Sequence, residues 1–208
     1  GTSADRPFGD SEKNKLVELL HELDEFYTVE VLAYSMMSNH VHICVYAPSE
    51  LPRSEDAAAR FNAYHKVLAA HRERVTGQRM PAQSIRQDSY RIEQVQRRLR
   101  DISYFMKDLQ QRFTQWYNKR LSRRGAVWAD RFKNVLLEGE GGNSAVWNCV
   151  KYIELNALRA GLVEEPADYR YCSWGVWHGR SKHPFAGNFF RHMRIVCTLS
   201  RLSLPFSL

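Results

Sequence analysis

The stretch VEVLAYSMMSNHVHICVYA, residues 29–47, decides the fold that the sequence predicts. Its two halves, Val29–Met37 and His40–Ala47, are rich in the β-branched and aromatic residues that strands favour. The Ser38-Asn39 pair between them is typical of a turn. The stretch therefore predicts two neighbouring strands joined as a hairpin.

Helical periodicity surrounds this hairpin on both sides. Leucines recur three and four positions apart in the segment Ser11–Phe26, which places them on one stripe of a helix. Asp101 is suited to cap the N-terminus of a new helix inside the long helical pattern Ile92–Leu121, which would divide the pattern into two helices. Four further elements are expected: helices over Glu55–Val75, over Asn143–Ala160 and near Phe189–Leu199, and a strand over Ala126–Leu137.

The expected strands are a hairpin and a third strand far along the sequence, and helices lie between them. This mixture predicts an α+β fold. We expect an antiparallel sheet with helices packed on one face, helical insertions, and loops at Thr76–Asp88 and Gly139–Gly142. We expect one domain over residues 1–165 and a C-terminal extension over residues 166–208 that packs on it.

The composition restricts the class of protein. The chain has 208 residues, 44% of them hydrophobic, so it is long enough to bury a core. Lys and Arg number 30 against 23 Asp and Glu, and a net charge of +7 favours a polyanionic partner such as nucleic acid. No apolar run approaches the roughly 20 residues of a membrane span, and the start lacks a secretory pattern. The four cysteines are scattered, which predicts reduced thiols in the cytoplasm.

Two histidines share one face of the second strand. Side chains alternate along a strand, so His40 and His42 point the same way, and Val41 points the other way. That is the arrangement that two metal ligands need. Exposed strand histidines are also ordinary, and the pair alone leaves both interpretations open.

The expected helix over residues 143–160 carries a polar stripe. Asn148, Tyr152 and Asn156 lie four positions apart and share a face of that helix. A tyrosine in this setting is a competent nucleophile at phosphorus, and a divalent metal polarises the phosphoryl group. The alternative is that Tyr152 is a packing residue. Tyr104 and Tyr117 compete for the nucleophile role, but they follow the apolar stripe of their own helix, which favours core packing.

Basic residues gather around the expected turn before Ala126, with Trp116, Tyr117 and Trp128 close by in the sequence. Cations follow phosphates and aromatic rings stack on unpaired bases, so this region is a candidate surface for single-stranded nucleic acid. The alternative is a solvated face. The candidate residues are Arg112, Lys119, Arg120, Arg123, Arg124, Arg131 and Lys133.

Three blocks in this order resemble a known family. MMSNHVHICV (36–45) resembles the metal-binding strand of the HUH (His-hydrophobe-His) single-tyrosine transposases. RGAVWADRFKNVLLEG (124–139) resembles their next strand block, with its WxxRF pattern. YIELNALRAGLVEEPADYRYCSWG (152–175) resembles the tyrosine helix of the REP-associated tyrosine transposases. The resemblance covers roughly residues 10–174.

The resemblance implies a ferredoxin-like domain that nicks and rejoins single-stranded DNA at hairpin-forming repeats. It implies that His40 and His42 bind Mg²⁺ or Mn²⁺ and that Asn156 completes the metal shell or positions the phosphate. It implies that Tyr152 attacks the scissile phosphate, which leaves a 5′-phosphotyrosine and a free 3′-OH. The REP-associated relatives also imply a monomer.

The sequence departs from the family at two points. Ala157 stands where the family usually has proline, and the family's first strand precedes the first helix, whereas this chain starts almost at that helix. We expect that strand to lie outside these residues. There are two alternatives: a DNA-binding regulator on the same scaffold that does not cleave, and a plasmid-type replication initiator, a class that shares the histidine pair but usually has more domains. Convergence of His40, His42 and Tyr152 on one ion separates the nuclease from the regulator.

Overall fold

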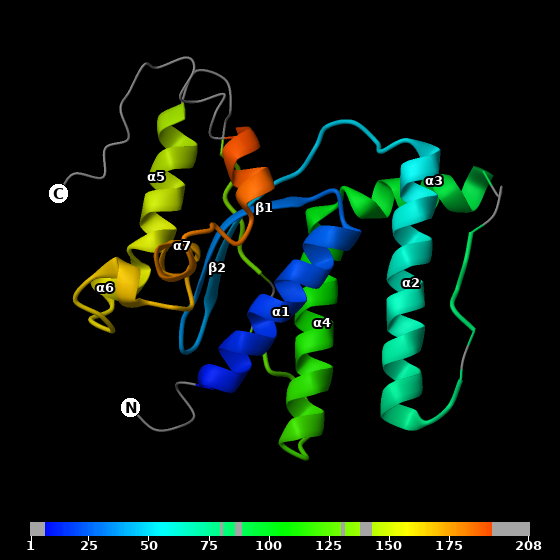
Figure 1. The fold of residues 1–208 in the computed structure, drawn as a ribbon, viewed down its shortest axis with the longest axis horizontal. Coiled ribbons are helices and arrows are strands. Elements are labelled where there is room, and N and C mark those ends of the chain that lie inside the picture. Colours follow the sequence, from blue (N-terminus) through cyan, green and yellow to red (C-terminus); the bar gives the residue numbers. More distant parts are fainter. Residues whose placement is uncertain (1–6, 80, 86–88, 130–131, 138–142, 193–208) are drawn as a thin grey trace. The chain divides into compact units, whose positions relative to one another are not determined.

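The computed structural model describes residues 7–79, 81–85, 89–129, 132–137 and 143–192, and it is mixed α/β (Figure 1). Residues 186–192 are helical as well. The named elements are α1 (Asp10–Phe26), β1 (Glu30–Met36), β2 (Val41–Tyr46), α2 (Ser54–Thr76), α3 (Ser89–Leu99), α4 (Ile102–Arg120), α5 (Asn143–Glu154), α6 (Asn156–Arg159), the 3₁₀ helix η2 (Pro166–Asp168) and α7 (Ser173–Arg180).

The predicted hairpin is confirmed. β1 and β2 pair as a two-stranded antiparallel sheet, and the backbone N–H of Met37 donates to the carbonyl of His40 at 2.9 Å across the turn. β1 is buried along nearly its whole length, whereas β2 is only partly covered. The sheet therefore leaves the histidine strand nearer to solvent.

The chain forms two compact units, each built from separate segments. Unit 1 contains residues 1–17, 31–45 and 131–208, and unit 2 contains residues 18–30 and 46–130. Helix α1 begins in unit 1 and ends in unit 2. The hairpin and the tyrosine helix α5 belong to unit 1, and most of the basic residues between α4 and Ala126 belong to unit 2.

In unit 1, the segment after α6 packs on β1. The hydroxyl of Tyr169 donates to the carbonyl of Met36 at 2.6 Å, and the N–H of Met36 donates to the carbonyl of Tyr171 at 2.9 Å. The Oγ of Ser173 accepts the N–H of Tyr34 at 2.7 Å. These bonds satisfy buried backbone groups of β1 that β2 does not reach.

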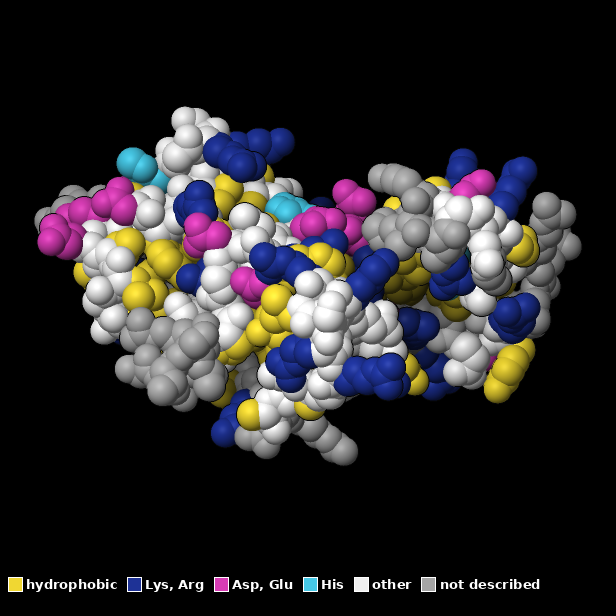
Figure 2. Space-filling view, turned by 90° about the horizontal axis from the view of Figure 1, so that it is seen from below, with side chains coloured by type: hydrophobic (Ala, Val, Ile, Leu, Met, Phe, Trp, Pro, Cys, Tyr) yellow, Lys and Arg dark blue, Asp and Glu magenta, His cyan; other side chains and the backbone are white. Residues whose placement is uncertain are grey.

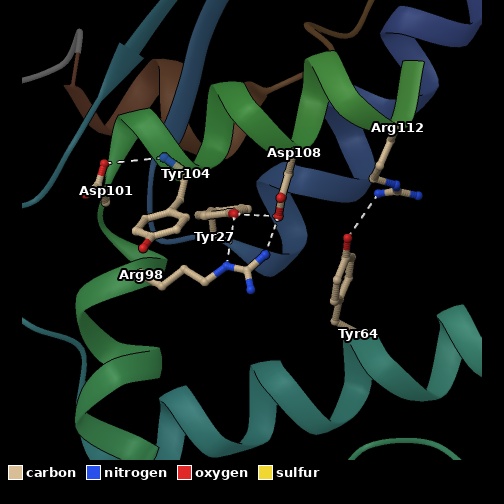
Figure 3. Close-up of polar contacts among 7 residues, drawn as sticks. All are labelled: Tyr27, Tyr64, Arg98, Asp101, Tyr104, Asp108 and Arg112. Carbon is tan, nitrogen blue, oxygen red and sulfur yellow. Dashed lines mark hydrogen bonds and ion pairs between the residues drawn. The ribbon is translucent and has the colours of Figure 1, made fainter. Parts of the chain in front are cut away.

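Unit 2 is helical and is tied together by a polar network (Figure 3). The hydroxyl of Tyr27 donates to Asp108 Oδ2 at 2.6 Å, and Arg98 pairs with the same oxygen at 2.6 Å. Burial, and then the bond to Asp108, raise the pKa of Tyr27 above its ordinary value, so the hydroxyl keeps its proton. The network joins the end of α1, α3 and α4.

Asp101 divides the long helical pattern in two, as one sequence interpretation expected. Its side chain accepts the N–H of Ser103 at 2.6 Å and that of Tyr104 at 3.4 Å, and α4 begins at the next residue. Such a cap satisfies N–H groups that the first turn of a helix leaves without partners.

The expected strand over Ala126–Leu137 is wrong for the residues that the structure describes there. Residues 126–129 and 132–137 form no strand, and the side chains of Val135 and Leu136 are 84% and 91% exposed. Instead, Trp128 of this segment packs against α4. Its ring lies on Phe113 with ring centroids 5.5 Å apart, and its Nε1–H donates to the Gln110 carbonyl at 3.1 Å. The glycine-rich loop Gly139–Gly142 lies outside the described residues.

The expected helix over residues 143–160 is two helices. α5 ends at Glu154 and α6 begins at Asn156, with Leu155 between them. Gly161 follows with φ of +64°, a left-handed conformation that suits its predicted role as a stop. The short helix expected near Phe189 is found earlier, over residues 186–192, and positions beyond 192 are outside the described residues.

Candidate functional site

The two histidines lie together, as their spacing predicts. His40 precedes β2 and His42 lies within it, and their ring centroids are 4.8 Å apart with an interplanar angle of 85°. His40 is exposed and His42 is half-buried. Both imidazoles are therefore within reach of an ion or phosphate at the surface.

Asn39 orients the His40 ring. The Oδ1 of Asn39 lies 2.7 Å from the Nδ1 of His40, and an amide oxygen only accepts, so Nδ1 carries the proton. The lone pair is then on Nε2, the nitrogen available to a metal. Burial lowers the pKa of both histidines below the ordinary value, and neighbouring His40 lowers that of His42 further. The neutral form, which binds metals, is therefore favoured at neutral pH.

Tyr152 lies beside this pair. It projects from α5 with 48% of its surface exposed, and its ring centroid is 5.6 Å from that of His42 at an interplanar angle of 85°. The guanidinium of Arg159 lies over the same ring, with Cζ 5.1 Å from the centroid. Unit 1 thus brings together two imidazoles, a phenol and a cation.

Arg159 is the residue that sequence reasoning missed. It lies seven positions after Tyr152, and residues seven apart in a helix share a face. That spacing was the available signal.

Asn156 lies next to the site at the start of α6, with its amide turned toward the end of α5. It is buried, and its Nδ2 donates to the carbonyl of Tyr152 at 2.8 Å, where α5 gives way to α6. Its Oδ1 takes no part in that bond. Within residues 7–192, apart from the gaps given above, no hydrogen bond joins Asn156 to His40 or His42, and no group of three His, Cys, Asp or Glu side chains is placed to hold a metal.

The core of unit 1 positions α5 against the hairpin. Val150 and Ile153 of α5 share a buried cluster with Leu32, Ala33 and Cys44 of the two strands. Glu154, at the end of α5, accepts the N–H of Trp174 at 2.9 Å, in the first turn of α7. Burial raises the pKa of Glu154 to about 7. Tyr152 therefore projects from a helix that is anchored both by apolar packing and by a polar contact.

The candidate DNA-binding residues divide between the two units. Lys119, Arg120, Arg123 and Arg124 are exposed in unit 2, around the end of α4. Arg120 lies over the Trp116 ring at 5.4 Å, and Arg123 over the Tyr117 ring at 5.4 Å. Lys133 is exposed in unit 1, and Arg131 lies outside the described residues. Figure 2 shows Lys and Arg side chains at many places on one face, several beside hydrophobic side chains.

Arg112, unlike these residues, is engaged within the protein. It forms an ion pair with Glu22. It also donates to the hydroxyl of Tyr64 at 3.3 Å (Figure 3). Only 22% of its side chain is exposed. Arg112 therefore links α1, α2 and α4, and it is less available to a ligand than the exposed cations.

The competing tyrosines lie in unit 2. Tyr117 is 7% exposed and stacks on Phe113 with centroids 5.8 Å apart, which agrees with the expected core role. Tyr104 is 44% exposed, with the guanidinium of Arg98 over its ring at 5.6 Å. No described contact brings a histidine to either tyrosine.

Comparison of the chain with protein-family models, with curated proteins and with solved structures found no match. Within the described ranges, no helix combines the length and the apolar character that crossing a membrane requires.

Proposed function

We propose that the chain is a metal-dependent nuclease and strand transferase for single-stranded DNA, of the single-tyrosine HUH type and its REP-associated branch. The proposal rests on one observation: His42 contacts both His40 and Tyr152, with ring centroids 4.8 and 5.6 Å away. The turn into β2, β2 itself and helix α5, about 100 positions further along the sequence, supply these three side chains. Ordinary core packing does not require two neutral imidazoles beside a half-exposed phenol.

The residues fit a divalent cation. His40 and His42 would hold it through neutral imidazole nitrogens, and Asn39 fixes the tautomer of His40. Imidazole and amide ligands suit Mn²⁺ well, and Mg²⁺ commonly keeps several waters, so two or three protein ligands suffice for either ion. The bound ion would polarise a phosphoryl oxygen of the scissile phosphate. Asn156 would add its Oδ1 or position the phosphate.

Tyr152 would carry the covalent step. Its phenolic oxygen attacks the scissile phosphorus, the new oxygen–phosphorus bond forms, and the bond to the 3′-oxygen breaks. The phenol gives up one proton and the departing 3′-oxygen gains one, which leaves a 5′-phosphotyrosine and a free 3′-OH. Attack by a 3′-OH on the phosphotyrosine reverses the step and rejoins a strand. Arg159, over the Tyr152 ring, would face the charge of the phosphate.

We propose that the hairpin is part of a ferredoxin-like sheet, which is supported by α5 packing against both strands. In unit 2 the exposed cations Lys119, Arg120, Arg123 and Arg124 would contact phosphates of the DNA backbone, and in unit 1 the exposed Lys133 would do so separately. The proposed substrate is single-stranded DNA with hairpin-forming repeats. The protein would act on it in the cytoplasm as a monomer.

Covalent trapping tests the proposal. Full-length protein is incubated with Mn²⁺ and end-labelled single-stranded hairpins from the DNA that flanks its own gene, and adducts are resolved on denaturing gels. We expect an adduct that Tyr152→Phe and His42→Ala abolish. Tyr104→Phe removes the same hydroxyl from another half-exposed tyrosine, so it is the matched control and keeps the adduct. An adduct that survives Tyr152→Phe contradicts the assigned nucleophile.

A DNA-binding regulator on the same scaffold is the second candidate. The bond that the Asn156 Nδ2 donates to the Tyr152 carbonyl favours it, because the amide already has a structural role within the protein. The same assay separates the two functions. Tight binding of the hairpins with no adduct in Mg²⁺ or Mn²⁺ would favour the regulator.

A further inference from the structure

The positive charge of the chain is concentrated toward its C-terminus. All 23 Asp and Glu residues lie at or before Asp168, whereas six of the 30 Lys and Arg residues lie in residues 169–208. Residues 169–208 therefore carry +6 of the formal net charge of +7, and residues 1–168, with 24 Lys and Arg against 23 Asp and Glu, carry +1. A segment with this much charge of one sign attracts polyanions. This part of the chain is thus a candidate surface for an anionic partner.

Two cations of this part have no partner within the protein. Arg180 ends α7 and Lys182 follows it in the turn toward residues 186–192, and both are exposed. Within the ranges that the structure describes, neither takes part in a hydrogen bond or an ion pair. Arg170, by contrast, is an exposed arginine that is paired with Asp10 at 2.6 Å. Arg180 and Lys182 are therefore available to an anionic ligand.

An exposed aromatic ring packs against the same face of α7. Phe190, in the helical residues 186–192, is 40% exposed, and its ring centroid is 5.6 Å from that of Trp177 in α7. Arg180 lies three positions after Trp177, so these two side chains share a face of the helix. Arg180, Lys182 and Phe190 together form the C-terminal patch.

The C-terminal patch is fixed to the helix that carries Tyr152. Phe189, the neighbour of Phe190, belongs to the buried cluster of unit 1 together with Val150 and Ile153 of α5. Trp177 packs against the same cluster. The patch and the proposed nucleophile are therefore supported by one packed core, and both belong to unit 1.

Two cations without partners beside an exposed ring match a single strand of nucleic acid. Lys and Arg contact phosphates, and an aromatic ring stacks on an unpaired base, whereas a duplex keeps its bases inside its own stack. An anionic membrane surface would instead need a broad apolar helix face next to the cations. Phe189 is 6% exposed and Trp177 packs against the core, so the aromatic side chains beside Phe190 face inward.

We propose that the C-terminal patch binds an unpaired stretch of the DNA strand that Tyr152 cleaves, with Arg180 and Lys182 on phosphates and Phe190 stacked on a base. The binding surface stands on the charge, exposure and contacts of these side chains. That the bound strand is the one being cleaved rests on the proposed function. Such a contact holds the flank of the cleavage site on the unit that carries the nucleophile, and it adds binding energy remote from the reacting phosphate.

Binding in EDTA tests the patch without any cleavage. Full-length protein is titrated by fluorescence anisotropy against labelled oligo-dT about 20 nucleotides long at several salt concentrations. The double variant Arg180→Gln/Lys182→Gln should reduce the slope of log affinity against log salt concentration by about 1.4. Phe190→Leu keeps an apolar side chain but loses the stacking ring, and should weaken binding at least about fivefold. Arg170→Gln is the matched control and should bind like the wild type.

The three side chains of the patch are exposed, so the variants should keep the melting temperature of the wild type. A wild-type slope in the double variant together with unchanged affinity in Phe190→Leu would overturn the proposal. Tighter binding to a dT–dA duplex than to the single strand would assign the patch to duplex DNA and would also overturn it. So would a double variant that loses binding to phosphatidylserine vesicles but not to oligo-dT, because the patch would then serve a membrane surface.

The trapping assay separates this proposal from the proposed function. An adduct in the wild type, with unchanged oligo-dT binding in the double variant and in Phe190→Leu, contradicts the patch alone. Binding that depends on the patch, with no adduct in Mg²⁺ or Mn²⁺, contradicts the strand transferase and leaves a surface for single strands. If both proposals hold, the double variant forms less adduct at DNA concentrations below the wild-type Kd. The difference should disappear at saturating DNA, because Tyr152 and the histidines are unchanged.

Discussion

His42 lies between two other rings, and its neighbours determine what it is able to do. His40 contacts it from the residue just before β2 and Tyr152 contacts it from α5, each at an interplanar angle of 85°. The spacing of the histidines predicted the first contact, because alternation along a strand is a local property. The second contact depends on how α5 packs on β2, which a sequence does not reveal locally. The polar stripe of Asn148, Tyr152 and Asn156 indicated a tyrosine that could face the histidines, and the family resemblance assigned it the role of nucleophile as an expectation.

His183 is a second histidine whose surroundings make a clear prediction. It is 2% exposed and stacks on Phe189 with ring centroids 4.3 Å apart. Its Nδ1 accepts the N–H of Phe185 at 3.1 Å, and its Nε2 has no hydrogen-bond partner in the described part of the chain. Burial lowers its pKa from 6.5 to about 4. The folded protein therefore keeps this ring neutral.

Acid should destabilise the protein through His183. The unfolded chain binds the proton near pH 6.5 and the folded chain only near pH 4, so the stabilisation is complete above pH 6.5 and is lost as the pH falls toward 4. The loss amounts to about 3 kcal/mol. His183→Phe should flatten the pH dependence of the free energy of unfolding in urea titrations at pH 7.0, 5.5 and 4.5. The exposed His178→Gln is the control and should keep the slope of the wild type; an equal slope in His183→Phe would contradict this account.

At the scale of elements, the start of α7 is held by a close backbone approach. A Cβ added to Gly175 would lie 2.1 Å from the carbonyl oxygen of Tyr169, a contact that side-chain movement does not relieve. Gly179, in the same helix, has no atom within 4 Å of such a Cβ. The two glycines form a matched pair in one helix.

Gly175→Ala should lower the free energy of unfolding by roughly 1–3 kcal/mol, the usual cost of overpacking. Gly179→Ala should leave it unchanged or raise it by up to about 1 kcal/mol, because alanine favours helices. Thermal and urea unfolding of both variants measure the difference. Equal stability of the two variants would contradict this expectation, because it would show that the backbone at Tyr169 moves away from the added methyl group at little cost.

Elements with a strong periodic pattern were predictable, and those that depend on a distant partner were not. The hairpin, α1 and the division at Asp101 follow from local patterns. The segment 126–137 has strand-like composition, yet Trp128 bonds to α4 and Val135 is exposed. A strand needs a partner edge, and nothing in these twelve or so residues specifies one. The break between α5 and α6 at Leu155 likewise coincides with a hydrogen bond from the Asn156 side chain to the Tyr152 carbonyl. The hydrophobic periodicity of the sequence does not predict such a bond.

At the scale of the whole molecule, the chain passes between its two units several times, near residues 17, 30, 45 and 130. No glycine-rich linker marks residues 17, 30 or 45, although Pro48 and Pro52 follow the last of these. Composition therefore gives little sign of interleaved segments. The net charge of +7 follows directly from the sequence. The structure was needed to show which cations are available to a ligand. Arg112 is paired with Glu22, whereas Lys119 is exposed.

Affinity for hairpin DNA should depend steeply on salt. Each phosphate contact on a single strand contributes a slope of about −0.7 to log affinity against log salt concentration. The double variant Arg120→Gln/Arg124→Gln should therefore reduce the slope by roughly 1.4 in fluorescence anisotropy titrations. Arg97→Gln is the control, because Arg97 is an exposed arginine already paired with Glu93 at 2.7 Å. A flat affinity across salt concentrations would contradict a polyanion as the ligand.

The central claim is that Tyr152, next to His40 and His42, is the residue that becomes joined to DNA. Mass spectrometry of the trapped adduct, after nuclease and protease digestion, tests it most directly because it identifies the modified side chain without any mutation. The account predicts a nucleotide on the peptide that contains Tyr152, formed only with Mg²⁺ or Mn²⁺. A nucleotide on Tyr104, Tyr117 or any other residue, or an adduct formed without a divalent cation, would contradict it.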